Sequence, residues 1–243
     1  MASQQRSRKA LGLWMNGHFV GTWSLEAGGD VLQYDSQWVQ SPQRRPLSLS
    51  LPFTPGNRPH KGHAVRFYFE NLLPDSKDIR ERVARRYQVG ATDAYTLLRE
   101  VGRDCVGALQ ILPEGDEPPT DLRVQAEPMS DHAVAQRIRT LAQPGALGDA
   151  GMADDFRISI AGAQEKDALL FWQGRWCRPL GATPTTHIFK LPLGLIGNLQ
   201  LDMQHSVENE WLCAQLLAAY GLPVASCEIL RFEDLKVLSV QRF

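Results

Sequence analysis

A polar, proline-rich run near the middle of the 243-residue chain limits how it can fold. Residues 113–119 read Pro-Glu-Gly-Asp-Glu-Pro-Pro, and proline supplies no backbone N–H group to a helix interior or a central strand. The run therefore predicts a boundary between two folded units. A second stretch, 143–155, is rich in glycine and alanine and predicts a flexible junction. We expect three parts, namely a unit at 10–113, a linker with one helix at 114–155, and a second unit at 156–243.

Composition excludes several classes of protein. The chain is 43% hydrophobic, with 26 Lys and Arg against 27 Asp and Glu for a net charge of −1, so it is neither disordered nor drawn as a whole to nucleic acid or anionic membrane. The longest apolar run, 191–196, is interrupted by Pro192 and Gly194 and is far shorter than the roughly 20 residues that span a bilayer. The basic N-terminus has no apolar segment behind it, which argues against a signal peptide. We expect a cytoplasmic protein without membrane contact.

Cysteine and histidine spacing gives no metal signature. The four cysteines lie far apart with no Cys-x-x-Cys pair, and we expect them to be buried, reduced and structural; they are Cys105, Cys177, Cys213 and Cys227. His60 and His63 are three residues apart in a stretch rich in proline and glycine that predicts a loop. A zinc site needs three or four placed ligands, so we do not expect one here.

The first unit opens with β structure. Strands are predicted at 11–15 and 18–23, because Asn16-Gly17 between them favours the positive φ angles of a two-residue hairpin turn. Further strands are predicted at 31–34 and at 47–51, where leucine alternates with serine.

Two helices follow in the first unit. Ile79, Val83 and Tyr87 are spaced by four after a capping Asp75 or Ser76. A second apolar stripe covers 94–101, with Thr92 as the expected cap and Gly102 as the end. We expect a helical hairpin on the sheet. Its four arginines, at 80, 82, 85 and 86, favour a solvated face over a nucleic-acid patch because acidic residues are interleaved.

The second unit has a different order of elements. After a helix predicted in the linker at about 130–141, the second unit itself is predicted to contain strands at 156–160, 167–172, 175–178 and 186–191, a helix at 206–220 with Ser206 as its cap, and strands at 225–231 and 236–242. A turn of small residues, 161–163, joins the first two strands. This order is that of a protein-kinase N-lobe, an antiparallel sheet with one helix. The predicted fold class is therefore α+β.

Three features of the second unit could carry chemistry. Small side chains at 161–163 let backbone N–H groups approach phosphate oxygens, although these residues taken alone favour an ordinary β-turn. Lys190 ends an apolar strand and Glu210 lies in the next helix, as a nucleotide-binding N-lobe requires for its phosphate lysine and the glutamate that holds it. The alternative is a strand-end lysine reaching water and a glutamate favoured by the helix dipole.

Longer motifs carry a family resemblance. Residues 156–166, 183–192 and 207–210 closely resemble the HipA family, the kinase toxins of bacterial HipBA toxin–antitoxin modules; upstream, 47–52, 69–75 and 101–109 resemble the family's N-terminal subdomain. The resemblance covers nearly the whole chain, in order. It implies a serine/threonine protein kinase that uses ATP and Mg²⁺, phosphorylates a cytoplasmic protein, and is neutralised by a HipB antitoxin dimer through which it reaches DNA.

The resemblance also assigns residues. The phosphate-binding loop would comprise Ala161, Gly162, Ala163, Gln164, Glu165 and Lys166. Lys190 would bind nucleotide phosphates with Glu210 as its support, and Ser159 matches the serine that the family autophosphorylates to switch itself off. The interlobe hinge that meets adenine would comprise Gln241, Arg242 and Phe243, with Gln241 in place of the usual glutamate.

Other kinase parts are missing from the sequence. No catalytic Asp is followed five residues later by a metal-binding Asn, and the last residues form an apolar strand. We therefore expect this chain to be the N-terminal part of a longer kinase, without the helical C-lobe and its metal ligands, and to be inactive alone. We also expect it to expose an apolar surface toward that C-lobe, which the same chain or a separate chain would supply. The alternative is a non-catalytic module that docks on an antitoxin or a kinase chain. A direct nucleic-acid binder is a third, weaker reading given the near-neutral charge.

Overall fold

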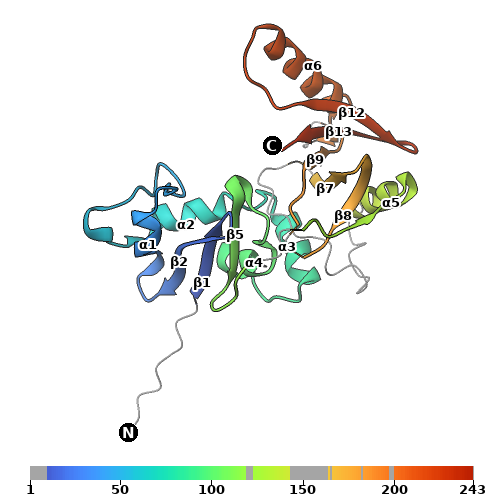
Figure 1. Cartoon of the computed structure of the whole chain (residues 1–243). Helices are drawn as coiled ribbons and strands as arrows, with labels where there is room; N and C mark the ends of the chain where they lie inside the picture. The colour runs from blue at the N-terminus through green and yellow to red at the C-terminus, as the bar shows by residue number, and fades with distance from the viewer. Residues whose placement is uncertain are drawn as a thin grey trace. The chain divides into compact units, whose positions relative to one another are not determined.

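The computed structural model describes residues 10–118, 123–142, 164, 166–181, 183–196 and 200–242 (Figure 1). The described residues form two compact units, one containing 10–118 and the other containing 123–242. The helix of the expected linker and the short strand before it both belong to the second unit. The chain is mixed α and β, and every strand pairing in its described sheets is antiparallel.

The first unit is built on an antiparallel sheet in the order β4-β3-β2-β1-β5. Its strands are β1 (Ala10–Met15), β2 (His18–Glu26), β3 (Gly29–Tyr34), β4 (His60–Lys61) and β5 (Leu109–Pro113). The turn between β1 and β2 has φ of 50° at Asn16 and 78° at Gly17, which confirms the predicted hairpin. The expected third strand is also present.

Helices cover this sheet and complete its core. They are α1 (Ser36–Gln40), α2 (His63–Glu70), α3 (Lys77–Arg86) and α4 (Ala94–Val101), with single 3₁₀ turns at Pro55–Asn57 and Val106–Ala108. Trp23 of β2 stacks on Phe69 of α2 with ring centroids 3.7 Å apart. The helices α3 and α4 are confirmed, except that Asp93 rather than Thr92 caps α4 by accepting a hydrogen bond from the Thr96 N–H group, 3.0 Å away.

The strand predicted at 47–51 is wrong. This segment is a turn around the phenol of Tyr34, whose hydroxyl accepts from the Leu47 N–H group at 2.9 Å and donates to the Leu51 carbonyl at 2.6 Å. Ser48 Oγ accepts from the Ser50 N–H group. These contacts satisfy the backbone groups that a neighbouring strand would otherwise pair, so the Leu-Ser alternation marks no strand. Burial raises the pKa of Tyr34 to about 12, which keeps this hydroxyl protonated.

Two expectations about single residue types also need correction. His60 lies in the two-residue strand β4 and His63 begins α2, so both histidines are in regular structure, whereas Arg58, Pro59 and Gly62 lie outside any helix or strand. His60 Nε2 lies 2.6 Å from the carbonyl of Pro52. Cys105 and Cys177 are buried as expected, whereas Cys227 is half-buried and Cys213 is exposed on a helix.

The second unit is built on an antiparallel sheet in the order β12-β13-β9-β7-β8-β6. Its strands are β6 (Ala126–Pro128), β7 (Lys166–Trp172), β8 (Arg175–Pro179), β9 (His187–Lys190), β12 (Cys227–Phe232) and β13 (Leu235–Gln241), and its helices are α5 (Asp131–Ala142) and α6 (Ser206–Ala219). A separate hairpin, β10 (Gly194–Ile196) with β11 (Leu201–Met203), occupies the expected loop before α6. The strand and turn predicted at 156–163 lie outside the described residues.

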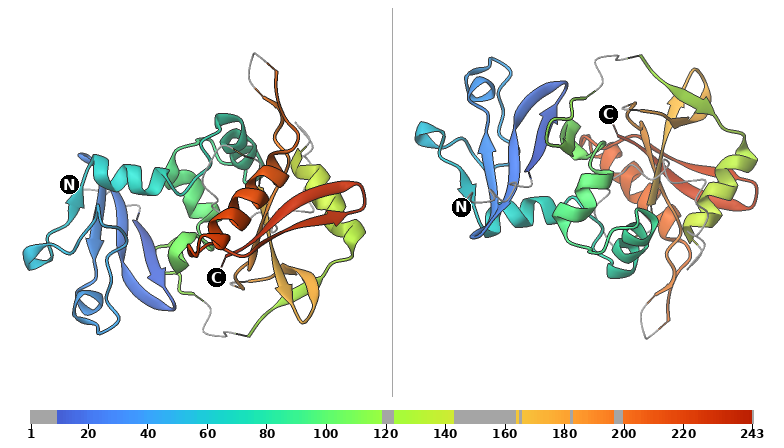
Figure 2. Two further views of the ribbon diagram at one scale, coloured as in Figure 1. Left: turned by 90° about the horizontal axis from the view of Figure 1, so that it is seen from above. Right: turned by 90° about the horizontal axis from the view of Figure 1, so that it is seen from below.

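The two helices lie on opposite faces of this sheet. Val134, Ala135 and Ile138 of α5 share a buried cluster with Phe189 of β9 and Val237 of β13. Successive strand residues point to opposite faces, so the lysines next to these two residues belong to the other face. Figure 2 shows α6 running along the β12–β13 hairpin, with which it is in contact. Among the described helices, none is both long and apolar enough to cross a membrane.

Candidate functional site

The centre of the candidate site is an ion pair between β9 and α6. Lys190 is the last residue of β9, and its Nζ donates a hydrogen bond to Oε1 of Glu210 in the second turn of α6. Both side chains are partly buried, which strengthens a charge-assisted hydrogen bond relative to one in water. The lysine and glutamate that the sequence singled out are thus brought together.

Lys166 joins this site from the neighbouring strand. In the β7–β9 register its Cα pairs with that of Lys190, so the two side chains leave the sheet on the same face, with Cβ atoms about 5 Å apart. Just before it, the Gln164 side-chain amide donates to the carbonyl of Leu191 at 2.6 Å. The chain that leads into β7 is therefore fastened beside the end of β9 that carries Lys190.

A second pair of the same kind lies on the adjacent strand. Lys236 Nζ of β13 donates to Oε1 of Glu208, two residues before Glu210 in α6. This hydrogen bond lowers the pKa of Glu208. Sequence reasoning did not find this pair, although the spacing Glu-x-Glu offered two carboxylates. The two pairs tie α6 to two strands of the sheet.

The cap of α6 differs from its prediction in a way that matters for the site. The residue that precedes the helix is His205, and it provides no side-chain cap. Ser206 Oγ instead accepts from the N–H group of Leu193, at 3.0 Å. The start of α6 is thereby attached to the segment that follows Lys190.

The expected hinge residues lie at the other end of β9. Gln241 pairs with His187 in the β13–β9 register, and the Arg242 N–H group donates to the carbonyl of Thr186 at 2.9 Å. The guanidinium of Arg242 donates to Oγ1 of Thr185, which is buried. His187 and Lys190 are three residues apart, about 10 Å along the strand. The structure does not bring Gln241 and Arg242 to Lys190.

Several predicted site residues lie outside the described part of the chain. They are Ser159, Ala161, Gly162, Ala163, Glu165 and Phe243. The phosphate-binding role of the small-residue turn therefore stays a prediction. Among the described residues, no cluster of three or more His, Cys, Asp or Glu could hold a metal ion.

A buried ion pair supports the site from the opposite face of the sheet. The guanidinium of Arg137 in α5 donates two hydrogen bonds to the carboxylate of Asp167, from Nε at 2.5 Å and from Nη2 at 2.9 Å. Asp167 follows Lys166 directly in β7. Because adjacent strand residues alternate, fixing Asp167 toward α5 directs Lys166 toward α6.

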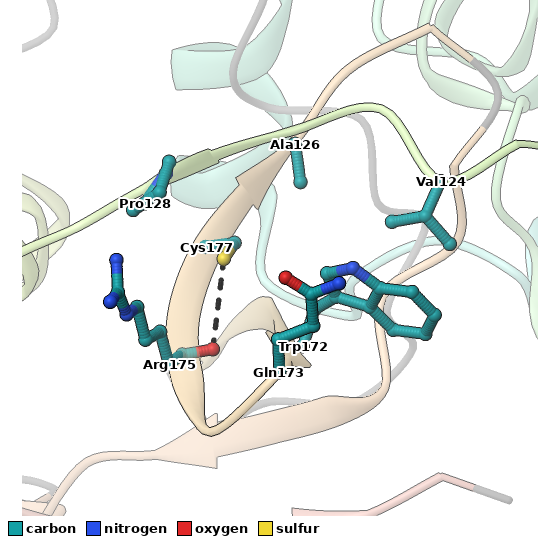
Figure 3. A pocket seen from close by; sticks show the side chains of 7 residues that line it. All are labelled: Val124, Ala126, Pro128, Trp172, Gln173, Arg175 and Cys177. Atoms are coloured by element: carbon teal, nitrogen blue, oxygen red, sulfur yellow. Dashed lines mark hydrogen bonds between the residues drawn. The ribbon is translucent and has the colours of Figure 1, made fainter.

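A separate depression of about 300 Å³ lies at the far end of β7 (Figure 3). It is lined by Val124, Ala126, Pro128, Trp172, Gln173, Arg175 and Cys177. Lys166 and Trp172 are six residues apart, about 20 Å along the strand. The depression is therefore not part of the Lys190 site, and its side chains contain no acid–base or nucleophile–base pair.

Family models cover most of the chain. The model for the HipA N-terminal domain matches residues 11–112, and the model for the HipA-like C-terminal domain matches residues 158–243.

Individual relatives agree with these models. The chain is 30% identical to the Sinorhizobium fredii protein named "Putative kinase Y4mE", over 97% of this chain and 54% of the relative, and 27% identical to the serine/threonine-protein kinase toxin HipA of Shewanella oneidensis, over 92% and 47%. The solved complex of Shewanella oneidensis HipA with HipB and operator DNA matches with a TM-score of 0.70 at 26% identity, over 96% of this chain and 50% of that chain. The chain spans about half the length of the curated relatives it matches. This chain belongs to the HipA family.

Proposed function

We propose that this chain carries the nucleotide-binding half of a HipA-type serine/threonine kinase toxin, with the fold of a kinase N-lobe in its second unit. The observation that carries the proposal is the Lys190–Glu210 pair between β9 and α6. A strand lysine held by a helix glutamate is the arrangement that orients the α- and β-phosphates of ATP in protein kinases. The family membership and the kinase names of two relatives support it.

In this proposal the residues of the second unit have distinct tasks. The ammonium of Lys190 neutralises phosphate charge, and Glu210 holds that ammonium in place. Lys166 brings a second ammonium from the same face of the sheet, and the small residues 161–163 approach the phosphates through backbone N–H groups. The nucleotide would extend along β9 toward Gln241, Arg242 and Phe243, where backbone groups meet adenine.

The reaction itself needs parts that we assign to the other half of a HipA-type protein. The γ-phosphoryl group of ATP moves to a serine or threonine hydroxyl of a cytoplasmic protein, with ADP as the leaving group and a carboxylate accepting the hydroxyl proton. Mg²⁺ would neutralise the developing charge. The described residues hold no cluster of metal ligands, so we propose that the ligands and the catalytic base come from that half. We expect no phosphoryl transfer from residues 1–243 alone.

The Lys236–Glu208 pair provides a matched control for a test of the nucleotide site. Both lysines are partly buried, with side chains 24% exposed for Lys190 and 17% for Lys236, and both reach a glutamate of α6. Lys190→Ala should weaken ATP binding at least tenfold in isothermal titration, because a phosphate loses a charge-assisted hydrogen bond worth about 1.5–3 kcal/mol. Lys236→Ala should stay within about threefold of the unsubstituted chain. Equal losses in both variants would overturn the nucleotide site.

Ser159 is the proposed regulatory position. A phosphate there adds nearly two negative charges beside a loop that binds ATP phosphates, and it would repel them. Ser159→Glu should lower ATP affinity in the same titration, whereas Ser159→Ala should leave it unchanged. Equal affinity of the two variants would remove Ser159 as a switch.

We propose a HipB-like antitoxin as the partner of the complete protein. The support is the solved complex of a relative with HipB and operator DNA. The near-neutral charge of this chain favours DNA contact through the antitoxin rather than directly. A gel shift of operator DNA should therefore need HipB, and a shift by the chain alone would contradict this assignment.

A further inference from the structure

Helix α6 has two apolar faces, and only one of them packs on the sheet. Val207, Trp211, Ala214 and Ala218 are spaced by three or four along one side of the helix. Of these, Val207 is fully buried and Ala214 is half-buried, so this side faces the β12–β13 hairpin that α6 contacts, although Trp211 is 37% exposed. On the opposite face, Leu212, Leu216 and Tyr220 are spaced by four and form one line along the helix. These three and the adjacent Leu217 form what we name the outward face. A soluble helix that is apolar all round is normally buried.

The outward face is exposed in the described structure. Leu216 is 52% exposed and Tyr220 is 83% exposed, with Leu212 and Leu217 close to half. The apolar surface continues past the helix end to Leu222 and Val224, which are also exposed. A contiguous apolar surface of this kind marks an interaction site in a folded protein.

The chemistry of α6 narrows the class of partner. Residues 206–224 contain two glutamates, Glu208 and Glu210, and no lysine or arginine. Helices that bind membrane surfaces carry basic residues on their polar face, and nucleic-acid contacts need positive charge. The partner is therefore a protein surface. Glu208 and Glu210 pair with lysines of the sheet rather than lying on the outward face. Their charges therefore do not decide against a second copy of this chain, and sedimentation in the test below distinguishes that occupant.

We infer that the outward face of α6 is the docking surface for the half of a HipA-type protein that this chain does not span. The curated relatives are about twice the length of the matched region, so each carries as much additional polypeptide as this chain contains. An apolar face without basic residues fits burial against such a folded half, as in an interdomain core. This inference places on α6 the apolar surface that we expect to face a C-lobe.

Hydrogen exchange of α6 tests this docking without any nucleotide. The probes are two chimeras, in which this chain replaces the matched region of the Sinorhizobium fredii protein or of Shewanella oneidensis HipA. Cooperative thermal unfolding of each chimera checks that it folds. Amides of 212–220 should exchange quickly in residues 1–243 alone and at least tenfold more slowly in the chimera, because covering the helix suppresses its local opening.

A matched pair of substitutions assigns the effect to the outward face. Leu216→Asp should restore fast exchange in the chimera. Leu49→Asp places the same change at an exposed leucine of the first unit and should have no effect on α6.

Three results would overturn the inference. The first is slow amide exchange of α6 in monomeric residues 1–243, because the chain itself would then cover the outward face. The second is protection through self-association in sedimentation, which makes a second copy the occupant. The third is fast exchange in both chimeras. Loss of ATP binding with docking intact would count only against the proposed nucleotide site.

Discussion

Lys190 shows how a single residue at a strand end can be identified from sequence. It ends an apolar strand two residues before Pro192, and Glu210 stands 20 positions later in a helix. These local patterns left an ordinary strand-end lysine and a helix-dipole glutamate equally open, and the family resemblance then assigned the pair its role. The Lys236–Glu208 pair was not predicted, because nothing local distinguishes Lys236 from a solvated strand lysine. Its contact arises only from the packing of α6 on β13.

The environment of His187 predicts how the stability of the fold depends on pH. Its ring packs edge-on against those of Phe171 and Trp176, with centroids 6.0 and 5.1 Å away. Burial lowers the pKa of His187 below its ordinary 6.5, and Glu228 opposes this only in part. As pH falls, the unfolded chain therefore protonates this histidine before the folded chain does. The contribution of the neutral imidazole to the free energy of unfolding is fully present above pH 6.5 and decreases as pH falls from 6.5 to the lower pKa of the folded state.

Thermal unfolding at pH 7.5 and 5.5 measures this contribution. The unsubstituted chain should lose more stability on acidification than His187→Gln, which has no proton to bind at this position. Parallel losses in the two proteins would contradict a lowered pKa at the half-buried His187.

At the scale of elements, prediction succeeded where the signal is local. The β1–β2 hairpin is set by its Asn-Gly turn, and α3 and α4 are set by apolar periodicity and caps. The strand prediction failed at 47–51 because the Tyr34 hydroxyl that shapes this turn lies 17 residues from Leu51 in the sequence. The hairpin β10–β11 was missed because its two strands of three residues are too short to display a period.

The attachment of α5 to β7 gives a prediction about stability. Arg137 and Asp167 are both buried, so removing the charge of Asp167 takes from the buried guanidinium the carboxylate that accepts two of its hydrogen bonds. Asp167→Asn should lower the free energy of unfolding by about 3–5 kcal/mol in urea titration. The control is Glu127→Gln in the more exposed pair with Arg178, which should change it by less than about 1 kcal/mol. Similar effects in both variants would show that burial does not decide the strength of these pairs.

At the scale of the whole molecule, the sequence motifs were sufficient to predict the HipA family, and two family models and the relatives confirm it. The candidate site was predictable only in part. Lys190 and Glu210 meet, while Gln241 and Arg242 lie at the far end of β9. The sequence predicted an apolar surface toward a C-lobe but did not locate it. The second apolar face of α6 can be recognised only after the structure shows which face packs on the sheet.

The central claim is that the segment entering β7 and the amine of Lys190 bind the same nucleotide phosphates. An ATP derivative with a reactive acyl group on its terminal phosphate transfers that group to lysines beside the phosphates, and peptide mass spectrometry then identifies the modified residues. The account predicts labelling of Lys190 and Lys166 that unmodified ATP suppresses. Labelling of exposed lysines such as Lys61 and Lys77, without suppression by ATP and without modification of Lys190, would contradict it.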